Sequence, residues 1–290
     1  MRAQQAAIVI HGLAWLPWVV IFPAVVLLWR DRTRTAGLWA IGVGYTLAAL
    51  VGQLSVAVVF SLAALGVAGW AVMRGTSRWA RIAGHLLFIL TAIALRLHVA
   101  PGFNNPVAIN GLISPDAVPY KAYLNLDKTL SAVWVVAFIA WLDTAGPTLR
   151  RVGLGIAFGL GSFAALALCA LAVGLVQFEP KLPASAWLWA LNNVILVCFA
   201  EEVFFRGYLQ AGLVRLLNKR RGADWIAITI AALAFGAAHY GQGLTMQLLS
   251  VLAGIGYGLA YRRAGLIGAI AAHAALNICH FFLLTYPALA

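Results

Sequence analysis

The sequence predicts an all-α protein, a polytopic bundle of about ten transmembrane helices. Of its 290 residues, 63% are hydrophobic and only 10% are charged, whereas a soluble domain carries about 25% charged residues. Leu38–Met73 and residues 152–178 contain no charged side chain, and both stretches exceed the roughly 20 apolar residues that span a bilayer. Alternating strand patterns are absent. The class is therefore a helical membrane protein and not a transmembrane barrel.

The positive charge points to the membrane and not to nucleic acid. The net charge of +12 comes from 20 Lys and Arg against 8 Asp and Glu, and these basic residues lie between apolar segments. By the positive-inside rule such clusters mark cytoplasmic loops. We expect a multi-pass protein of a bacterial inner (plasma) membrane, with the bilayer as partner; no feature specifies an oligomeric state. The five clusters are Arg30, Arg32 and Arg34; Arg74, Arg78 and Arg81; Arg150 and Arg151; Arg215, Lys219, Arg220 and Arg221; and Arg262 and Arg263.

The basic clusters also predict the topology, because two consecutive cytoplasmic clusters must be separated by an even number of crossings. Residues 35–73 should therefore form a hairpin that turns at Gly52 and Gln53. A single long helix with a buried re-entrant piece is the alternative, and it would give nine helices. Both termini are expected outside. The predicted helices are 6–29, 36–52, 54–73, 79–99, 129–147, 152–177, 184–217, 225–240, 243–261 and 265–286.

One long polar connection interrupts the helices. Residues 101–127 contain four prolines and several Asn and Gly residues, which prevent a continuous helix, and we expect an extracytoplasmic loop there. Arg150 and Arg151 follow Gly146 and Pro147 and mark the boundary between two parts. Residues 1–150 would form an N-terminal transmembrane extension, favoured as a packing scaffold over a substrate entrance, and residues 151–290 the functional core.

Two adjacent carboxylates in one apolar helix are the first functional signal. Ionisable groups inside a membrane are costly, so each should have a partner or a task. Glu202 and Arg206 are four residues apart and can pair on one helix face. Glu201 lies about 100° away around the same helix, and no local cation accounts for it. Such a surplus buried carboxylate is a candidate general base.

Histidines and an amide on two later helices extend this signal. His239 ends one predicted helix, and His273 and Asn277 share a face of the last one at four-residue spacing. His11 and His280 are interpreted as packing or interfacial residues, and so are Cys169, Cys198 and Cys279, which lack metal-ligand or disulfide spacing. The other residues suit a hydrolysis in which Glu201 and His239 activate a water molecule. His273 and Asn277 would then donate hydrogen bonds to the oxyanion of the intermediate.

These three elements resemble the motifs of the CAAX prenyl protease and bacteriocin-processing family, known as CPBP or ABI proteases. The family motifs are Glu-Glu-x-x-x-Arg, Phe-x-x-x-His and His-x-x-x-Asn. The chain carries them in the same order, without a departure, as Glu201-Glu202-Val-Phe-Phe-Arg206, Phe235-Gly-Ala-Ala-His239 and His273-Ala-Ala-Leu-Asn277. The resemblance covers residues 184–286. It implies a glutamate-type intramembrane endopeptidase that acts on a membrane-anchored or lipidated peptide or protein, without a cofactor.

Three other functions compete with this interpretation. Glu201, His239 and His273 could together bind zinc in a metal-dependent protease. The metal-free scheme is preferred because Asn277 is a poor zinc ligand and Arg206 would place a cation beside the metal. A non-catalytic bacteriocin-immunity or partner-binding protein is the second alternative, and a transporter with a carboxylate proton relay is the third. The sequence does not choose among substrates.

Overall fold

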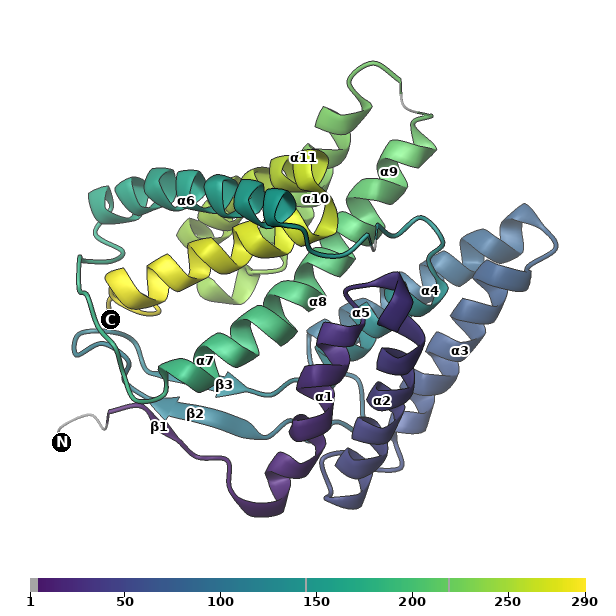
Figure 1. Cartoon of the computed structure of the whole chain (residues 1–290), viewed down its shortest axis with the longest axis horizontal. Coiled ribbons are helices and arrows are strands. Elements are labelled where there is room, and N and C mark those ends of the chain that lie inside the picture. The colour runs from purple at the N-terminus through teal and green to yellow at the C-terminus, as the bar shows by residue number, and fades with distance from the viewer. Residues whose placement is uncertain (1–4, 144, 219) are drawn as a thin grey trace. The chain divides into compact units, whose positions relative to one another are not determined.

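The computed structural model describes residues 5–143, 145–218 and 220–290, and the chain is mostly helical, as predicted (Figure 1). It divides into two compact units. Unit 1 contains the N-terminal segment up to Val9, Ala108–Ala122 and Trp141–Ala290, whereas unit 2 contains Ile10–Val107 and Tyr123–Ala140. All the candidate functional residues lie in unit 1.

Unit 2 is built from paired helices that pack through small residues. Its helices are α1 (Leu16–Leu27), α2 (Asp31–Leu50), α3 (Val58–Arg74), α4 (Arg78–Arg96) and α5 (Leu126–Phe138). A Cβ atom added at Gly44 of α2 would lie 2.5 Å from Ile21 of α1, and one at Gly84 of α4 would lie 2.9 Å from Ala71 of α3. Close backbone approach at glycine is how helices associate in lipid, where water does not drive them together.

Unit 1 holds the long helices. Its helices are α6 (Leu149–Ala172), a continuous run made of α7 (Ala186–Asn192), η2 (Asn193–Cys198), α8 (Phe199–Glu202), η3 (Val203–Gln210) and α9 (Ala211–Leu216), then α10 (Ala223–Ala237) and α11 (Leu244–Leu283). Gly155 and Gly159 of α6 face the backbone of α11, since a Cβ at either would lie 2.4 Å from a carbonyl oxygen. These glycines let α6 lie directly against α11.

Helix α11 folds back on itself at Gly265. The backbone there has φ 69° and ψ −164°, a left-handed region that favours glycine. Tyr257 and His273 lie on opposite sides of this position, and their rings stack with centroids 4.5 Å apart. In a straight helix, 16 residues would separate them by about 24 Å. The two arms of α11 therefore run side by side in opposite directions.

The helix count differs from the prediction. The described residues contain nine helices instead of about ten when α11 is counted as one, although its two arms on either side of Gly265 correspond to the predicted helices 243–261 and 265–286. Helix α5 also ends at Phe138 and not at residue 147. Ile139, the residue after the helix, has an extended backbone with φ −98° and ψ 105°. Asp143 further along accepts a hydrogen bond from the Ala145 amide at 3.1 Å and forms an ion pair with Arg151 at 3.1 Å.

A small sheet is added to the helical architecture. Its strands are β1 (Ala7–Ile8), β2 (Val107–Gly111) and β3 (Tyr120–Tyr123), in the order β1-β2-β3. β1 pairs with β2 in antiparallel register, with Ile8 opposite Ile109. The predicted first helix therefore starts at Leu16, because the residues before it belong to the sheet and a short 3-10 turn. The predicted loop 101–127 contains the other two strands.

The protein is an integral membrane protein. Four helices among the described residues are long and apolar enough to cross a membrane, namely Arg78–Arg96, Leu149–Ala172, Ala186–Leu216 and Leu244–Leu283. In unit 1 the basic residues gather at one end: Arg151 and Arg263 line the same cavity, and Arg262 forms an ion pair with Asp224 at the start of α10, at 3.0 Å. The positive-inside rule predicts that this end of unit 1 faces the cytoplasm.

Candidate active site

The carboxylates lie in an irregular part of their helix. Glu201 and Glu202 form the end of the short α-helical piece α8, with the π-helical segments η2 before it and η3 after it. A π-helix is rare, and its single-turn form recurs at functional sites. Glu201 is 8% exposed and Glu202 is fully buried, so both carboxylates are placed in the interior of unit 1.

Glu202 joins the first motif to the third. Its Oε1 accepts a hydrogen bond from Arg206 at 3.0 Å, so the ion pair expected from the four-residue spacing is present. The same oxygen lies 2.8 Å from Nδ1 of His273, and that ring nitrogen must donate because a carboxylate can only accept. Glu202 Oε2 is buried without a hydrogen-bond partner among the described residues. A water molecule or a ligand would satisfy it.

Arg206 is fully buried inside an aromatic enclosure. Its guanidinium lies 4.6 Å from the centroid of the Phe235 ring and 5.2 Å from that of Tyr257, distances at which a cation is attracted to the ring face. It also donates to the Gly254 carbonyl at 3.1 Å. The cation is thus compensated by a carboxylate, a carbonyl and two rings, so its position is strongly determined.

His239 lies just beyond the end of α10. Its Nδ1 is 2.8 Å from the Phe235 carbonyl, and since that oxygen only accepts, Nδ1 carries the proton and Nε2 is the basic nitrogen of the neutral ring. The Phe235 ring lies 4.8 Å from the His239 ring and 5.7 Å from the His273 ring. The Phe of the second motif therefore orients His239 through its carbonyl and packs between the two histidines.

Asn277 is held by an amide that the sequence analysis did not single out. Its Nδ2 donates to Oδ1 of Asn193 at 3.1 Å, and the Cys198 thiol donates to the same oxygen at 3.4 Å. Cys198 and Asn193 are five residues apart, the spacing of successive π-helical turns. The pairing of Asn193 with Cys198 depends on the π-helical register of η2. A regular α-helix would instead bring residues three or four positions apart onto the same face.

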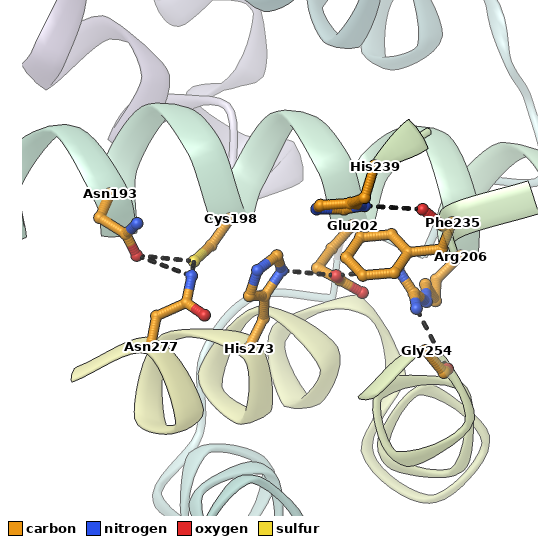
Figure 2. A network of polar contacts seen from close by, with 9 residues as sticks. All are labelled: Asn193, Cys198, Glu202, Arg206, Phe235, His239, Gly254, His273 and Asn277. Atoms are coloured by element: carbon orange, nitrogen blue, oxygen red, sulfur yellow. Dashed lines mark hydrogen bonds and ion pairs between the residues drawn. The ribbon is translucent and has the colours of Figure 1, made fainter. Parts of the chain in front are cut away.

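Five of the predicted site residues lie close together in Figure 2, which does not draw Glu201; they are Glu202, Arg206, His239, His273 and Asn277. Glu202, Arg206 and His273 form one bonded network, and Asn277 is tied to the same long helix through Asn193. Glu201 interacts electrostatically with Arg206. Figure 2 shows His273 and Asn277 projecting from the second arm of α11 toward the helix that carries Glu202. Unit 1 thus brings the three motifs together from α8, the end of α10 and α11.

The described residues contain no grouping of three or more His, Cys, Asp or Glu arranged to hold a metal ion. The two histidines use their Nδ1 atoms to donate to protein oxygens. The other ring nitrogen of each is the one that could bind a water, a substrate oxygen or a metal.

Comparisons with known proteins connect this part of the chain with one enzyme family. Residues 183–279 match the model of the type II CAAX prenyl endopeptidase Rce1-like family. The match contains all three motifs and ends just after Asn277. It covers about a third of the chain, and it begins close to the start of α7.

One curated protein shares a shorter stretch with the chain. An alanine racemase from Levilactobacillus brevis is 39% identical over 70 residues, which are 23% of this chain and 18% of the racemase. The chain thus spans less than a fifth of that protein, so the match carries no statement about racemase chemistry. No solved structure matches the chain.

Proposed function

Residues 183–279 form a domain of the CAAX protease family, and we propose that the chain is a glutamate-dependent intramembrane endopeptidase. The family match supports the enzyme class, which is a peptide hydrolase of the membrane. The assignment of glutamate chemistry rests on the residues of the site. Its central support is the hydrogen bond between Glu202 and His273, which couples two motifs that lie 71 residues apart.

Glu201 and His239 are proposed to activate the attacking water. Glu201 would remove a proton from a water held by Nε2 of His239, the nitrogen left as acceptor by the bond to Phe235. The hydroxide would add to the carbonyl carbon of the scissile peptide bond. The carbon–nitrogen bond then breaks, and the proton taken up by Glu201 passes to the leaving amine.

His273 and Asn277 are proposed to stabilise the oxyanion of the tetrahedral intermediate. Because His273 donates from Nδ1 to Glu202, it would donate from Nε2 to the oxyanion in the form with both ring nitrogens protonated. Asn277 has two amide hydrogens, and one is used by Asn193. Glu202 and Asn193 would then act as positioning residues for the two donors.

The substrate class follows from the location of the site. The first and third motifs lie in helices that are long and apolar enough to cross a membrane, and the second lies at the end of the shorter apolar helix α10. A membrane-anchored or lipidated peptide therefore reaches them more readily than a soluble protein does. We propose such a substrate, cleaved in a bacterial inner membrane, without a metal or other cofactor. The extension 1–150 is proposed as a packing scaffold.

The test is to compare membranes that contain the wild type with membranes that contain Glu201→Gln or His239→Gln. Peptides released from the membrane proteome are identified by mass spectrometry, and a Glu179→Gln variant serves as control because it removes a carboxylate outside the three motifs. We expect Glu201→Gln and His239→Gln to release none of the wild-type products while inserting normally. Retained cleavage in either variant contradicts the assignment, and wild-type membranes without any specific product favour the non-catalytic alternative.

A further inference from the structure

A basic cavity lies at one end of unit 1, where α6 begins and α11 folds back. It has a volume of about 320 Å³. Arg150, Arg151, Arg262 and Arg263 line it, and Asp143 is the one carboxylate among the described residues of the lining. Four cations and one anion therefore share a small volume.

The positive charge of this cavity is not balanced by the protein. Arg151 pairs with Asp143 at 3.1 Å, and Arg262 pairs with Asp224 at 3.0 Å. Arg150 and Arg263 are exposed and have no carboxylate partner among the described residues. Arg150 also lies in the first turn of α6, where the helix dipole is positive and a further cation is unfavourable. An anion bound here would relieve both kinds of repulsion.

A separate apolar cavity lies further along the same two helices. It has a volume of about 540 Å³ and lies between α6 and the first arm of α11, which run alongside one another (Figure 1). Small residues create the space, since their side chains leave a groove between the helices. The lining includes Ala157, Gly161, Ala165, Leu252, Ile255 and Gly256.

The two cavities have the spacing of a lipid headgroup and its chain. The ten residues from Arg151 to Gly161 rise about 15 Å along α6, which is half of the roughly 30 Å hydrocarbon core of a bilayer. We propose that one anionic phospholipid binds along α6 and α11. Its phosphate contacts Arg150 and Arg263, and one acyl chain lies in the groove past Gly161. This site is independent of the proposed proteolysis.

Lipid binding can be measured on the purified, full-length protein by native mass spectrometry in detergent. Dioleoyl-phosphatidylglycerol is titrated against zwitterionic dioleoyl-phosphatidylcholine, and the dissociation constant of the most tightly retained lipid is determined. Arg150→Gln with Arg263→Gln should weaken phosphatidylglycerol binding about fivefold per arginine, or roughly thirtyfold together. Arg220→Gln with Arg221→Gln is the matched control, because it removes two exposed charges outside the lining, and it should change the constant less than about twofold.

A separate variant tests the part of the site that would hold the acyl chain. A Cβ at Gly161 meets nothing within 4 Å, so Gly161→Leu places a side chain in the open space of the groove, and it should weaken binding roughly tenfold by displacing about two buried methylenes. An excess of inorganic phosphate should fail to displace the lipid. The proposal is overturned if phosphatidylcholine binds equally well, if the control pair weakens binding as much as the arginine pair, if Gly161→Leu has no effect, or if phosphate alone displaces the lipid.

Discussion

Removal of the Glu202 carboxylate should be among the most destabilising single changes in unit 1. In Glu202→Ala, the fully buried Arg206 loses its counter-ion, and the Nδ1–H of His273 loses its acceptor. Breaking a buried pair by removing one member costs about 3 to 5 kcal/mol, because an uncompensated charge stays behind. We expect a loss of stability of that size.

A double variant separates the cost of an unpaired buried charge from the cost of lost packing. Glu202→Met with Arg206→Met removes both charges and keeps apolar volume, and such replacements of buried pairs are often neutral. The remaining cost is then the orphaned N–H of His273, about 1 to 3 kcal/mol. Asp224→Ala is the surface control: its ion pair with Arg262 is partly exposed, and a pair of this kind contributes about 1 kcal/mol or less.

The assay is reversible unfolding in mixed micelles with increasing sodium dodecyl sulfate, followed by loss of helical circular dichroism. The reasoning is refuted if Glu202→Ala costs no more than Asp224→Ala, or if the double variant is as unstable as Glu202→Ala. Loss of peptide cleavage is expected in both Glu202 variants, because His273 is no longer oriented.

Three further predictions follow from the contacts described above. Asn193→Ala should lower kcat about tenfold, and Asn277→Ala should lower it about 10² to 10³-fold, as removal of an oxyanion donor does. In single-turnover kinetics the double variant should be as slow as Asn277→Ala alone. Additive losses in the double variant would contradict the positioning role of Asn193. Gly159→Ala should destabilise the α6–α11 contact by about 1 to 3 kcal/mol through overpacking, whereas Gly161→Ala, with nothing within 4 Å, should unfold like the wild type. Chelators should leave cleavage unchanged, and zinc that co-purifies in stoichiometric amount and is required for cleavage would instead support the metal-dependent alternative.

The predictions that succeeded rest on local patterns. The Glu202–Arg206 pair follows from helical spacing, and the long apolar helices follow from hydropathy, because both depend on residues close in sequence. Pairing of β1 with β2 joins residues about 100 positions apart, and no local periodicity of the sequence predicts it. The break at Gly265 was expected as the gap between helices 243–261 and 265–286, whereas the stacking of Tyr257 on His273 across it depends on packing between the two arms.

The missed residues of the site share a physical cause. The bond from Asn277 to Asn193 spans 84 positions, and Asn193 stands in a segment whose register departs from the α-helix. The bond between His273 and Glu202 was likewise outside the reach of spacing, although both residues were singled out as members of separate motifs. Their meeting depends on the packing of α11 against the helix that contains α8.

The π-helical segments make the effect of a change in chain length depend on where it falls. A π turn accommodates one residue more than an α turn, so deleting a single residue from η2 would let the helix relax to α register. The side chains that follow would keep their directions, because the helix loses the same residue that the π turn had accommodated. A deletion in the regular helix α7 would instead rotate the side chains before it by about 100° relative to Glu201 and Glu202. A homologous chain with a one-residue deletion between Asn193 and Cys198 would thus retain all three motifs and present the same carboxylates toward α11.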